Sequence, residues 1–124
     1  MEIWVNPACS KCRAATAALD EAGIDYTVRR YLDDPPSRDE LRAVLDRLDL
    51  EPWHVARTKE KVADEIGLAS IPKDDSGRER WIDALVEHPV LIQRPIVTAD
   101  DGTTVIGRDE GALGTVIAAE EASG

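Results

Sequence analysis

The two cysteines of this chain, Cys9 and Cys12, constrain its fold and chemistry more than any other feature. They lie three positions apart, after a short apolar pattern typical of a strand (Met1, Ile3 and Val5) and before a pattern typical of a helix. Cys9 is therefore expected at a strand-to-helix turn, where backbone N–H groups stabilise an anion and lower the pKa of a thiol. A thiolate at neutral pH is a nucleophile, so the pattern predicts thiol chemistry.

Length and composition indicate one domain, residues 1–124, of the ordinary globular class, with 43% hydrophobic residues. The sequence contains no apolar run near 18 residues and no secretory signal, so a cytoplasmic protein with no membrane span is expected. A CxxC pair in this setting indicates redox or metal chemistry rather than a disulfide scaffold. Structural zinc normally needs four ligands, and His54 and His88 stand far apart in unlike contexts, so no metal site is expected.

The net charge is −10. An acidic field of this size disfavours nucleic acid as a direct partner. It also disfavours an anionic substrate, unless local arginines override it.

Apolar spacing predicts the elements at the two ends of the chain. The first part gives a strand at residues 2–6, a helix from Ser10 to Ala22 followed by Gly23, and a strand that includes Tyr26, Val28 and Tyr31. Later, Ile96–Ala99 and Thr103–Ile106 flank a hairpin turn, and Asp109 caps a final helix.

The segment between these parts is predicted to be a helical insert of about residues 37–90. Ser37 and Glu40 match a capping box, and Ser76 and Glu79 match a second one. A looser helix is expected from Lys59 to Ile66. The predicted fold class is thus α/β and thioredoxin-like: a βαβ unit, a helical insert, a ββ hairpin and a C-terminal helix.

Cys9 is interpreted as a low-pKa nucleophile, with Lys11 and Arg13 adding positive potential, in preference to a buried core cysteine. Arg13 is also expected to contribute to anion binding. Cys12 is interpreted as a resolving thiol that attacks an adduct on Cys9, in preference to a partly buried helix residue. Arg94-Pro95 precedes a strand. In a thioredoxin-like fold a proline at this place is usually cis and faces the active cysteine, so Arg94 is expected to point at Cys9.

Several stretches together resemble the arsenate reductase family of the thioredoxin-like, glutaredoxin-coupled type and the related Spx-type regulators. The matching stretches are Asn6-Pro7-Ala8-Cys9, Tyr31-Leu32, Pro35-Pro36-Ser37-Arg38-Asp39-Glu40-Leu41, Ala56-Arg57-Thr58-Lys59, Gly67-Leu68 and the run from His88 to Val97. They follow one another in order over nearly the whole chain, and the run from His88 to Val97 is the most specific.

The resemblance implies that Cys9 is the catalytic cysteine and that Arg57, Arg94 and Arg108 bind the anion. Taken alone, Arg57 and Arg108 are unremarkable. Guanidinium groups bind the oxygens of a tetrahedral oxyanion in a bidentate manner and stay charged. The implied reaction begins with attack of the Cys9 thiolate on arsenic and ends with arsenite, with Cys12 or an external thiol resolving the adduct.

Two positions depart from the family pattern. Val5 stands where the family has a histidine, which puts arsenate as the substrate in question, and Cys12 stands at a serine-like position. A Cys9–Cys12 disulfide switch in an Spx-like regulator that binds a protein partner is therefore the alternative function. The enzyme function implies no bound cofactor and recycling by glutaredoxin with glutathione, thioredoxin or another low-molecular-weight thiol. A monomer is expected, because no long exposed apolar stripe remains once the helices are packed.

Overall fold

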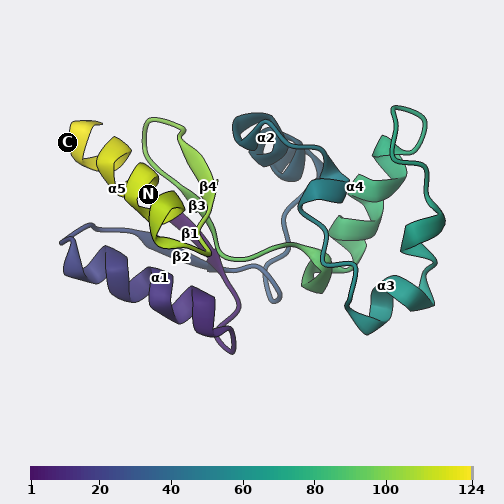
Figure 1. Ribbon diagram of the computed structural model, residues 1–124, viewed down its shortest axis with the longest axis horizontal. Coiled ribbons are helices and arrows are strands. Elements are labelled where there is room, and N and C mark those ends of the chain that lie inside the picture. The colour runs from purple at the N-terminus through teal and green to yellow at the C-terminus, as the bar shows by residue number, and fades with distance from the viewer. Residues whose placement is uncertain (124) are drawn as a thin grey trace. The chain divides into compact units, whose positions relative to one another are not determined.

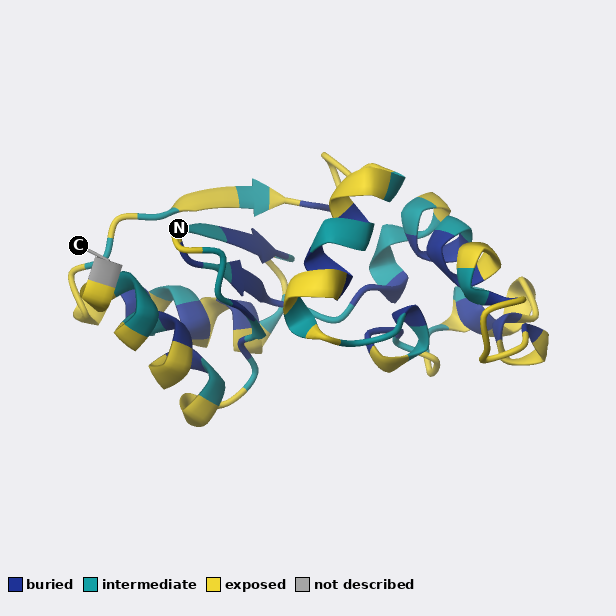
Figure 2. Ribbon diagram, turned by 90° about the horizontal axis from the view of Figure 1, so that it is seen from above, coloured by how far each residue is buried: buried dark blue, intermediate teal, exposed yellow. Residues whose placement is uncertain are grey.

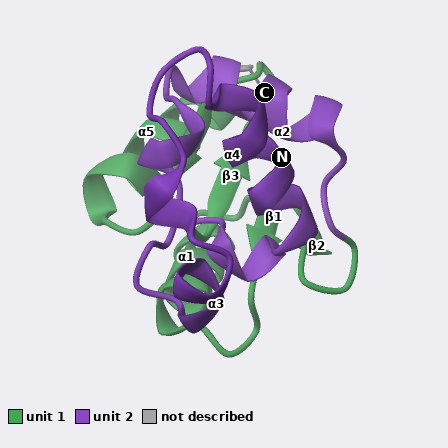
Figure 3. Ribbon diagram, turned by 90° about the vertical axis from the view of Figure 1, so that its right-hand side faces the viewer, with its two compact units in different colours: residues 1–34, 94–124 green, residues 35–93 purple. Residues whose placement is uncertain are grey.

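The computed structural model describes residues 1–123 of the chain. It contains two compact units, one formed by Met1–Asp34 with Arg94–Gly124 and the other by Pro35–Gln93 (Figure 3). The second unit lies close to the bounds predicted for the helical insert. The assignment of the whole chain to one domain stays a prediction.

The first unit is a four-stranded sheet with two helices (Figure 1). Its elements are β1 (Glu2–Val5), α1 (Ser10–Glu21), β2 (Thr27–Arg30), β3 (Ile96–Thr98), β4 (Thr104–Ile106) and α5 (Glu110–Ser123). The strand order is β2-β1-β3-β4, with β1 parallel to β2 and the other neighbours antiparallel. The predicted βαβ unit, hairpin and final helix are all present.

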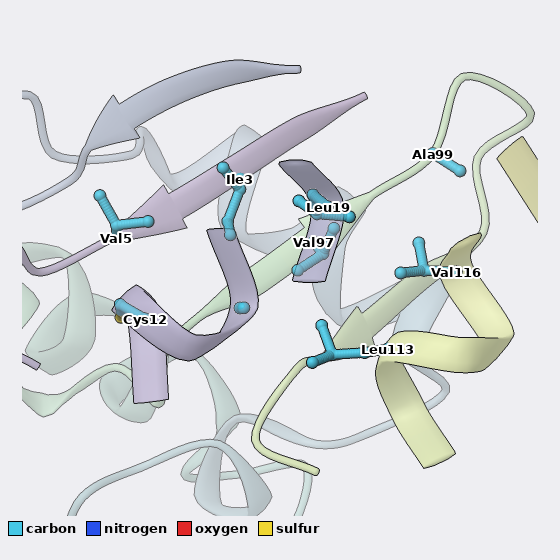
Figure 4. Packing of buried hydrophobic residues seen from close by; sticks show 9 residues of the cluster. Ile3, Val5, Cys12, Leu19, Val97, Ala99, Leu113 and Val116 are labelled. Atoms are coloured by element: carbon cyan, nitrogen blue, oxygen red, sulfur yellow. The ribbon is translucent and has the colours of Figure 1, made fainter. Parts of the chain in front are cut away.

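The core of this unit lies between one face of the sheet and the helices α1 and α5 (Figure 4). Ile3 and Val97 are adjacent partners of β1 and β3, and both are fully buried. The other buried members of this cluster are Val5, Cys12, Ala15, Leu19, Ala99, Leu113 and Val116. Cys12 therefore packs as part of the core, and its sulfur is shielded from solvent.

Most of the edge strand β2 is exposed to solvent (Figure 2), and Val28 within it is 47% exposed. The strand is shorter than the predicted alternation of Tyr26, Val28 and Tyr31. Tyr31 follows the strand in a turn, and it is fully buried.

Local residue chemistry accounts for the ends of the helices in this unit. Gly23 has φ +70° directly after the C-terminus of α1, a conformation that glycine adopts without steric cost. Asp109 Oδ1 accepts a hydrogen bond of 2.7 Å from the Ala112 N–H, so this residue caps α5 as predicted.

The second unit is helical and contains no strand among its residues 35–93. Its elements are α2 (Arg38–Leu48), η1 (Pro52–His54), α3 (Lys61–Glu65), η2 (Leu68–Ser70), α4 (Arg78–Glu87) and η3 (Pro89–Leu91). Both hydrogen bonds of the predicted capping box at Ser37 and Glu40 are present. Trp81 and Leu85 of α4 are fully buried. Within residues 1–123, no helix is long and apolar enough to cross a bilayer.

The second predicted capping box is wrong. Gly77 is the N-cap of α4 and Ser76 lies outside the helix. Asp74 Oδ1 accepts hydrogen bonds from the backbone N–H groups of Ser76 and Gly77, at 3.0 and 3.2 Å, and from the Ser76 hydroxyl. Because Ser76 is held by this preceding carboxylate, the helix starts one residue later than a Ser76 cap would place it. Glu79 bonds Arg42 and Arg38 instead of a capping N–H.

Candidate active site

The candidate site lies at the end of the sheet where β1 and β2 finish and β3 begins. The last registered pairs are Val5 with Arg30, Trp4 with Ile96, and Ile96 with Ile106. Extending the first register by one residue and the others by two places Asn6 opposite Tyr31 and Arg94, and Arg94 opposite Arg108. These four residues, here named the end row, lie within two residues of the four strand ends at this edge of the sheet.

Cys9 lies in the turn between β1 and α1, three residues after Asn6 of the end row. The Cys9 N–H bonds the Asn6 carbonyl at 2.9 Å, and the Ala8 N–H bonds Asn6 Oδ1 at 3.0 Å. These bonds close a tight turn that leaves Cys9 as the N-cap of α1, in extended conformation with φ −88°. The thiol is thereby placed at the positive end of the helix dipole.

The environment of Cys9 lowers its pKa to about 7. Burial alone would raise the pKa, but the Cys12 N–H, the Arg94 guanidinium, the Cys12 thiol and the Lys11 N–H all favour the thiolate and outweigh it. A pKa near 7 gives a large thiolate fraction at neutral pH while the sulfur stays a strong nucleophile.

Cys12 behaves in the opposite way, with a pKa raised to about 11. Burial is the largest cause, and the neighbouring Cys9 adds to it, whereas the Asn6 N–H and Arg94 act in the other direction. Both cysteines are free thiols in this structure. The pair therefore combines one thiolate-forming sulfur with one sulfur that keeps its proton.

Arg94 faces Cys9 from the start of β3. The Arg94–Pro95 peptide bond is cis, which is the form expected from the sequence. Burial lowers the pKa of Arg94, but its contacts with the Cys9 thiol and the Tyr31 hydroxyl raise the pKa above the usual value overall. The Nε and Nη1 atoms are buried and have no hydrogen-bond partner within residues 1–123. A buried charged donor without an acceptor is costly, so these atoms are suited to receive an oxyanion.

Arg108 is joined to Arg94 at the other end of the row. Its Nη1 donates a hydrogen bond of 2.9 Å to the Arg94 carbonyl oxygen. The Gly107 N–H bonds the Pro95 carbonyl at 2.8 Å. A side chain at Gly107 would approach Leu113 to 3.0 Å and Val97 to 3.2 Å, so glycine allows the close approach of this loop. Arg108 thus holds the main chain that carries Arg94.

Arg13 lies one turn into α1, and Val5 lies at the end of β1. Arg13 is exposed, and its Nη1 donates a 3.3 Å hydrogen bond to the Pro7 carbonyl. Val5 is 6% exposed and belongs to the apolar core. Because this position holds an apolar side chain, the thiolate of Cys9 depends on backbone N–H groups, Arg94 and the Cys12 thiol.

Arg57 belongs to the second unit. It lines a pocket of about 450 Å³ together with Ala56, Thr58, Lys59, Glu60 and Gln93. Arg57 Nε donates to Glu60 Oε1 at 3.1 Å, and its Nη1 donates to Gln93 Oε1 at 3.5 Å. Its charge is therefore partly balanced by a carboxylate, unlike that of Arg94.

The structure places Cys9, Cys12, Arg94 and Arg108 in the first unit, whereas Arg57, which was expected in the same site, belongs to the second unit. The assignment of these residues to one catalytic site stays a prediction. Sequence reasoning assigned no role to Tyr31, whose side chain helps to raise the pKa of Arg94. Its signal was its position at the carboxyl end of a strand parallel to β1, because parallel strands end at the same edge of a sheet.

Comparison with known proteins gives consistent relatives. The family model described as "ArsC family" matches residues 4–116. An "Uncharacterized protein in glnII region" of Streptomyces viridochromogenes is 63% identical over 113 residues, covering 91% of this chain and 95% of that protein. An arsenate reductase of Rhizobium meliloti is 40% identical over 111 residues, covering 90% of this chain and 77% of that protein.

Solved structures agree with the family match. An arsenate reductase from Vibrio cholerae superposes with a TM-score of 0.78 at 34% identity, over 95% of this chain and 97% of that one. A putative arsenate reductase from Yersinia pestis gives the same TM-score and identity over 86% of this chain and 91% of that one. The predicted thioredoxin-like α/β fold is therefore confirmed, and this chain belongs to the ArsC family.

Proposed function

We propose that the protein is an enzyme that reduces arsenate to arsenite with electrons from thiols. The observation that carries this proposal is a Cys9 thiol of pKa about 7 beside Arg94, whose buried Nε and Nη1 atoms find no acceptor among the described residues. The relatives named arsenate reductases support the choice of arsenate as the substrate.

In the first step the Cys9 thiolate attacks arsenic(V). An S–As bond forms, and an As–O bond breaks as that oxygen leaves as water after protonation. Arg94 donates to the arsenate oxygens and stabilises their charge, and its guanidinium cannot lose its proton in doing so. Arg108 supports this step by holding the Arg94 carbonyl.

In the second step a second thiolate attacks the Cys9 sulfur. The S–As bond breaks with its electron pair on arsenic, so arsenic(V) becomes arsenic(III) and two thiols become one disulfide. The overall balance is one arsenate and two thiols giving one arsenite, one disulfide and one water. Burial is the largest cause of the raised pKa of Cys12 and the Cys9 thiolate adds to it, so bonding of Cys9 to arsenic removes one of the causes that oppose formation of a Cys12 thiolate.

An external thiol then reduces the disulfide, or takes the place of Cys12 in the second step. Glutaredoxin with glutathione, thioredoxin and another low-molecular-weight thiol are the candidates, and none requires a bound cofactor. Arg57 and Arg13 keep their anion-binding roles as predictions from the resemblance and from their charge. An increased KM for arsenate in Arg57→Gln and Arg13→Gln would support those roles.

The experiment is direct measurement of arsenite formed by purified protein, with glutaredoxin/glutathione and thioredoxin systems run in parallel. We expect turnover that Cys9→Ser abolishes, and the productive thiol system identifies the reductant. If Cys12→Ser removes turnover with thioredoxin but keeps it with glutathione, reduction passes through an internal disulfide only in the first system.

Absence of turnover in every system, from protein whose Cys9 alkylates readily, would overturn the proposal. A Cys9–Cys12 disulfide that forms under mild oxidant and changes binding to a protein partner would then favour the redox-sensing regulator.

A further inference from the structure

The direction of the Arg94 guanidinium needs a structural cause. The group is charged, it has two buried nitrogen atoms that find no acceptor within residues 1–123, and it nevertheless lies against the Cys9 sulfur. Without an anchor such a side chain gains by turning its donors toward water. The Arg108 bond fixes the Arg94 main chain but leaves the orientation of the Arg94 guanidinium unexplained.

Tyr31 is placed to supply that anchor. Its register position beside Asn6 puts it in the end row with Arg94. It is fully buried, so its ring has little freedom to move. Tyr31 is among the groups that raise the pKa of Arg94, and since a guanidinium can only donate, the phenol oxygen is the atom of Tyr31 that accepts in such a contact.

We propose that Tyr31 is a positioning residue, whose buried hydroxyl orients the Arg94 guanidinium toward Cys9 and toward the oxyanion that Cys9 attacks. The part that concerns the oxyanion rests on the proposed function, whereas the part that concerns the thiol does not.

The chemical nature of Tyr31 suits this role. A carboxylate would also orient an arginine, but it would cancel the positive potential, as Glu60 partly does for Arg57 at 3.1 Å. A neutral phenol oxygen accepts one hydrogen bond and leaves the charge of Arg94 available to the thiolate and to an anion. The site therefore gains orientation while the positive charge is retained.

The first test is Tyr31→Phe, which removes one oxygen atom and keeps the ring. The rate of Cys9 alkylation by iodoacetamide is measured against pH, with peptide mass spectrometry separating Cys9 from Cys12. We expect the midpoint to rise by about 0.5–1 pH unit, which lowers the rate at pH 7 by about two- to fivefold. Tyr26→Phe is the matched control, because the chain has only two tyrosines and Tyr26 bonds Asp20 at 2.8 Å. An unchanged midpoint in folded Tyr31→Phe overturns the proposal.

A double-mutant cycle with Arg94→Lys tests whether Tyr31 acts through Arg94. In the Arg94→Lys background, Tyr31→Phe should cause little further change in the alkylation midpoint, because the group that it orients is gone. The full shift in that background would show that the hydroxyl acts on Cys9 by another route, and it would overturn the proposal.

A measurement without substitution covers the case in which Tyr31→Phe does not fold. With tyrosine labelled by ¹³C at Cζ, the Tyr31 resonance should move with a midpoint near pH 7 as Cys9 titrates, while the Tyr26 resonance stays in place. A Tyr31 chemical shift that stays constant while Cys9 titrates would contradict the proposal.

Neither the alkylation nor the resonance experiment uses arsenate, so failure of the reductase assay leaves this inference standing. If the protein does reduce arsenate, Tyr31→Phe should raise the KM for arsenate more than it lowers kcat, because Arg94 meets the anion in the ground state.

Discussion

At the scale of single residues, the surroundings of two chemically identical thiols shift their pKa values in opposite directions. Cys9 has backbone N–H groups and a guanidinium around it, and its pKa falls to about 7. Cys12 is 1% exposed, and its pKa rises to about 11. The CxxC pattern predicted both thiols, because their spacing and the adjoining helix are local in sequence. It did not reveal Tyr31, since pairing of β2 with β1 decides which strand ends meet.

The separation of the two pKa values predicts selective alkylation. The rate at Cys9 should rise through pH 7 as its thiolate forms, and Cys12 should stay unmodified up to about pH 10 because it is both protonated and buried. Time-resolved mass spectrometry of the two cysteine peptides measures both rates in one sample. Equal modification of the two cysteines at pH 7.5 would contradict the assigned environments.

At the scale of elements, patterns confined to a few residues predicted the structure well, and a competing neighbour caused the one clear error. The helix α1 ends before Gly23, and α2 starts at its capping box, because the groups that decide these ends are adjacent in sequence. At α4 the same Ser-x-x-Glu pattern failed, since Asp74 captures Ser76 before the helix begins. At this helix the acidic side chain two residues upstream therefore overrides the capping pattern.

The two serines give a matched comparison. Ser37→Ala should lower the free energy of unfolding by about 1 kcal/mol, because the Ser37 hydroxyl accepts from the Glu40 N–H at 3.1 Å. Ser76→Ala should cost clearly less, because Asp74 still accepts from the Ser76 and Gly77 N–H groups. Urea unfolding of both variants measures the difference. A larger loss at Ser76 than at Ser37 would show that the caps are wrongly assigned.

At the scale of the whole molecule, a chain of net charge −10 carries a locally cationic site. Arg94 and Arg108 meet at one end of the sheet, so a local charge opposes the general field where an anion would bind. The overall acidity was readable from composition. The local reversal was not, because it depends on strand ends that are distant in sequence.

The same two thiols should make the stability of the whole molecule depend on pH. Cys9 has a folded pKa of about 7, below its usual value near 9, so its stabilisation is present above pH 9 and is lost as the pH falls through 7. Cys12 has a folded pKa of about 11, so its stabilisation is present below pH 9 and is lost as the pH rises through 11. The stability advantage of reduced wild type over the Cys9→Ser, Cys12→Ala variant should therefore be greatest near pH 9.

Denaturant unfolding of both proteins from pH 6 to pH 11, in the presence of a reductant, measures this advantage. The double variant is the reference for all other titrating groups, because the serine and alanine that replace the two cysteines do not titrate in this range. A difference that is constant from pH 6 to pH 11 would show that the thiols do not have the assigned pKa values.

Because Cys12 is buried, the labelling rate of its thiol can report local opening of the structure. In a Cys9→Ser background, a thiol-specific dye can react only when the first turn of α1 separates from the core, so the labelling rate divided by that of an unfolded peptide gives the equilibrium constant for opening. The protein thus contains its own reporter of breathing motions beside the reactive turn. That reporter needs no engineered label, and it distinguishes a rigid site from one that samples open states.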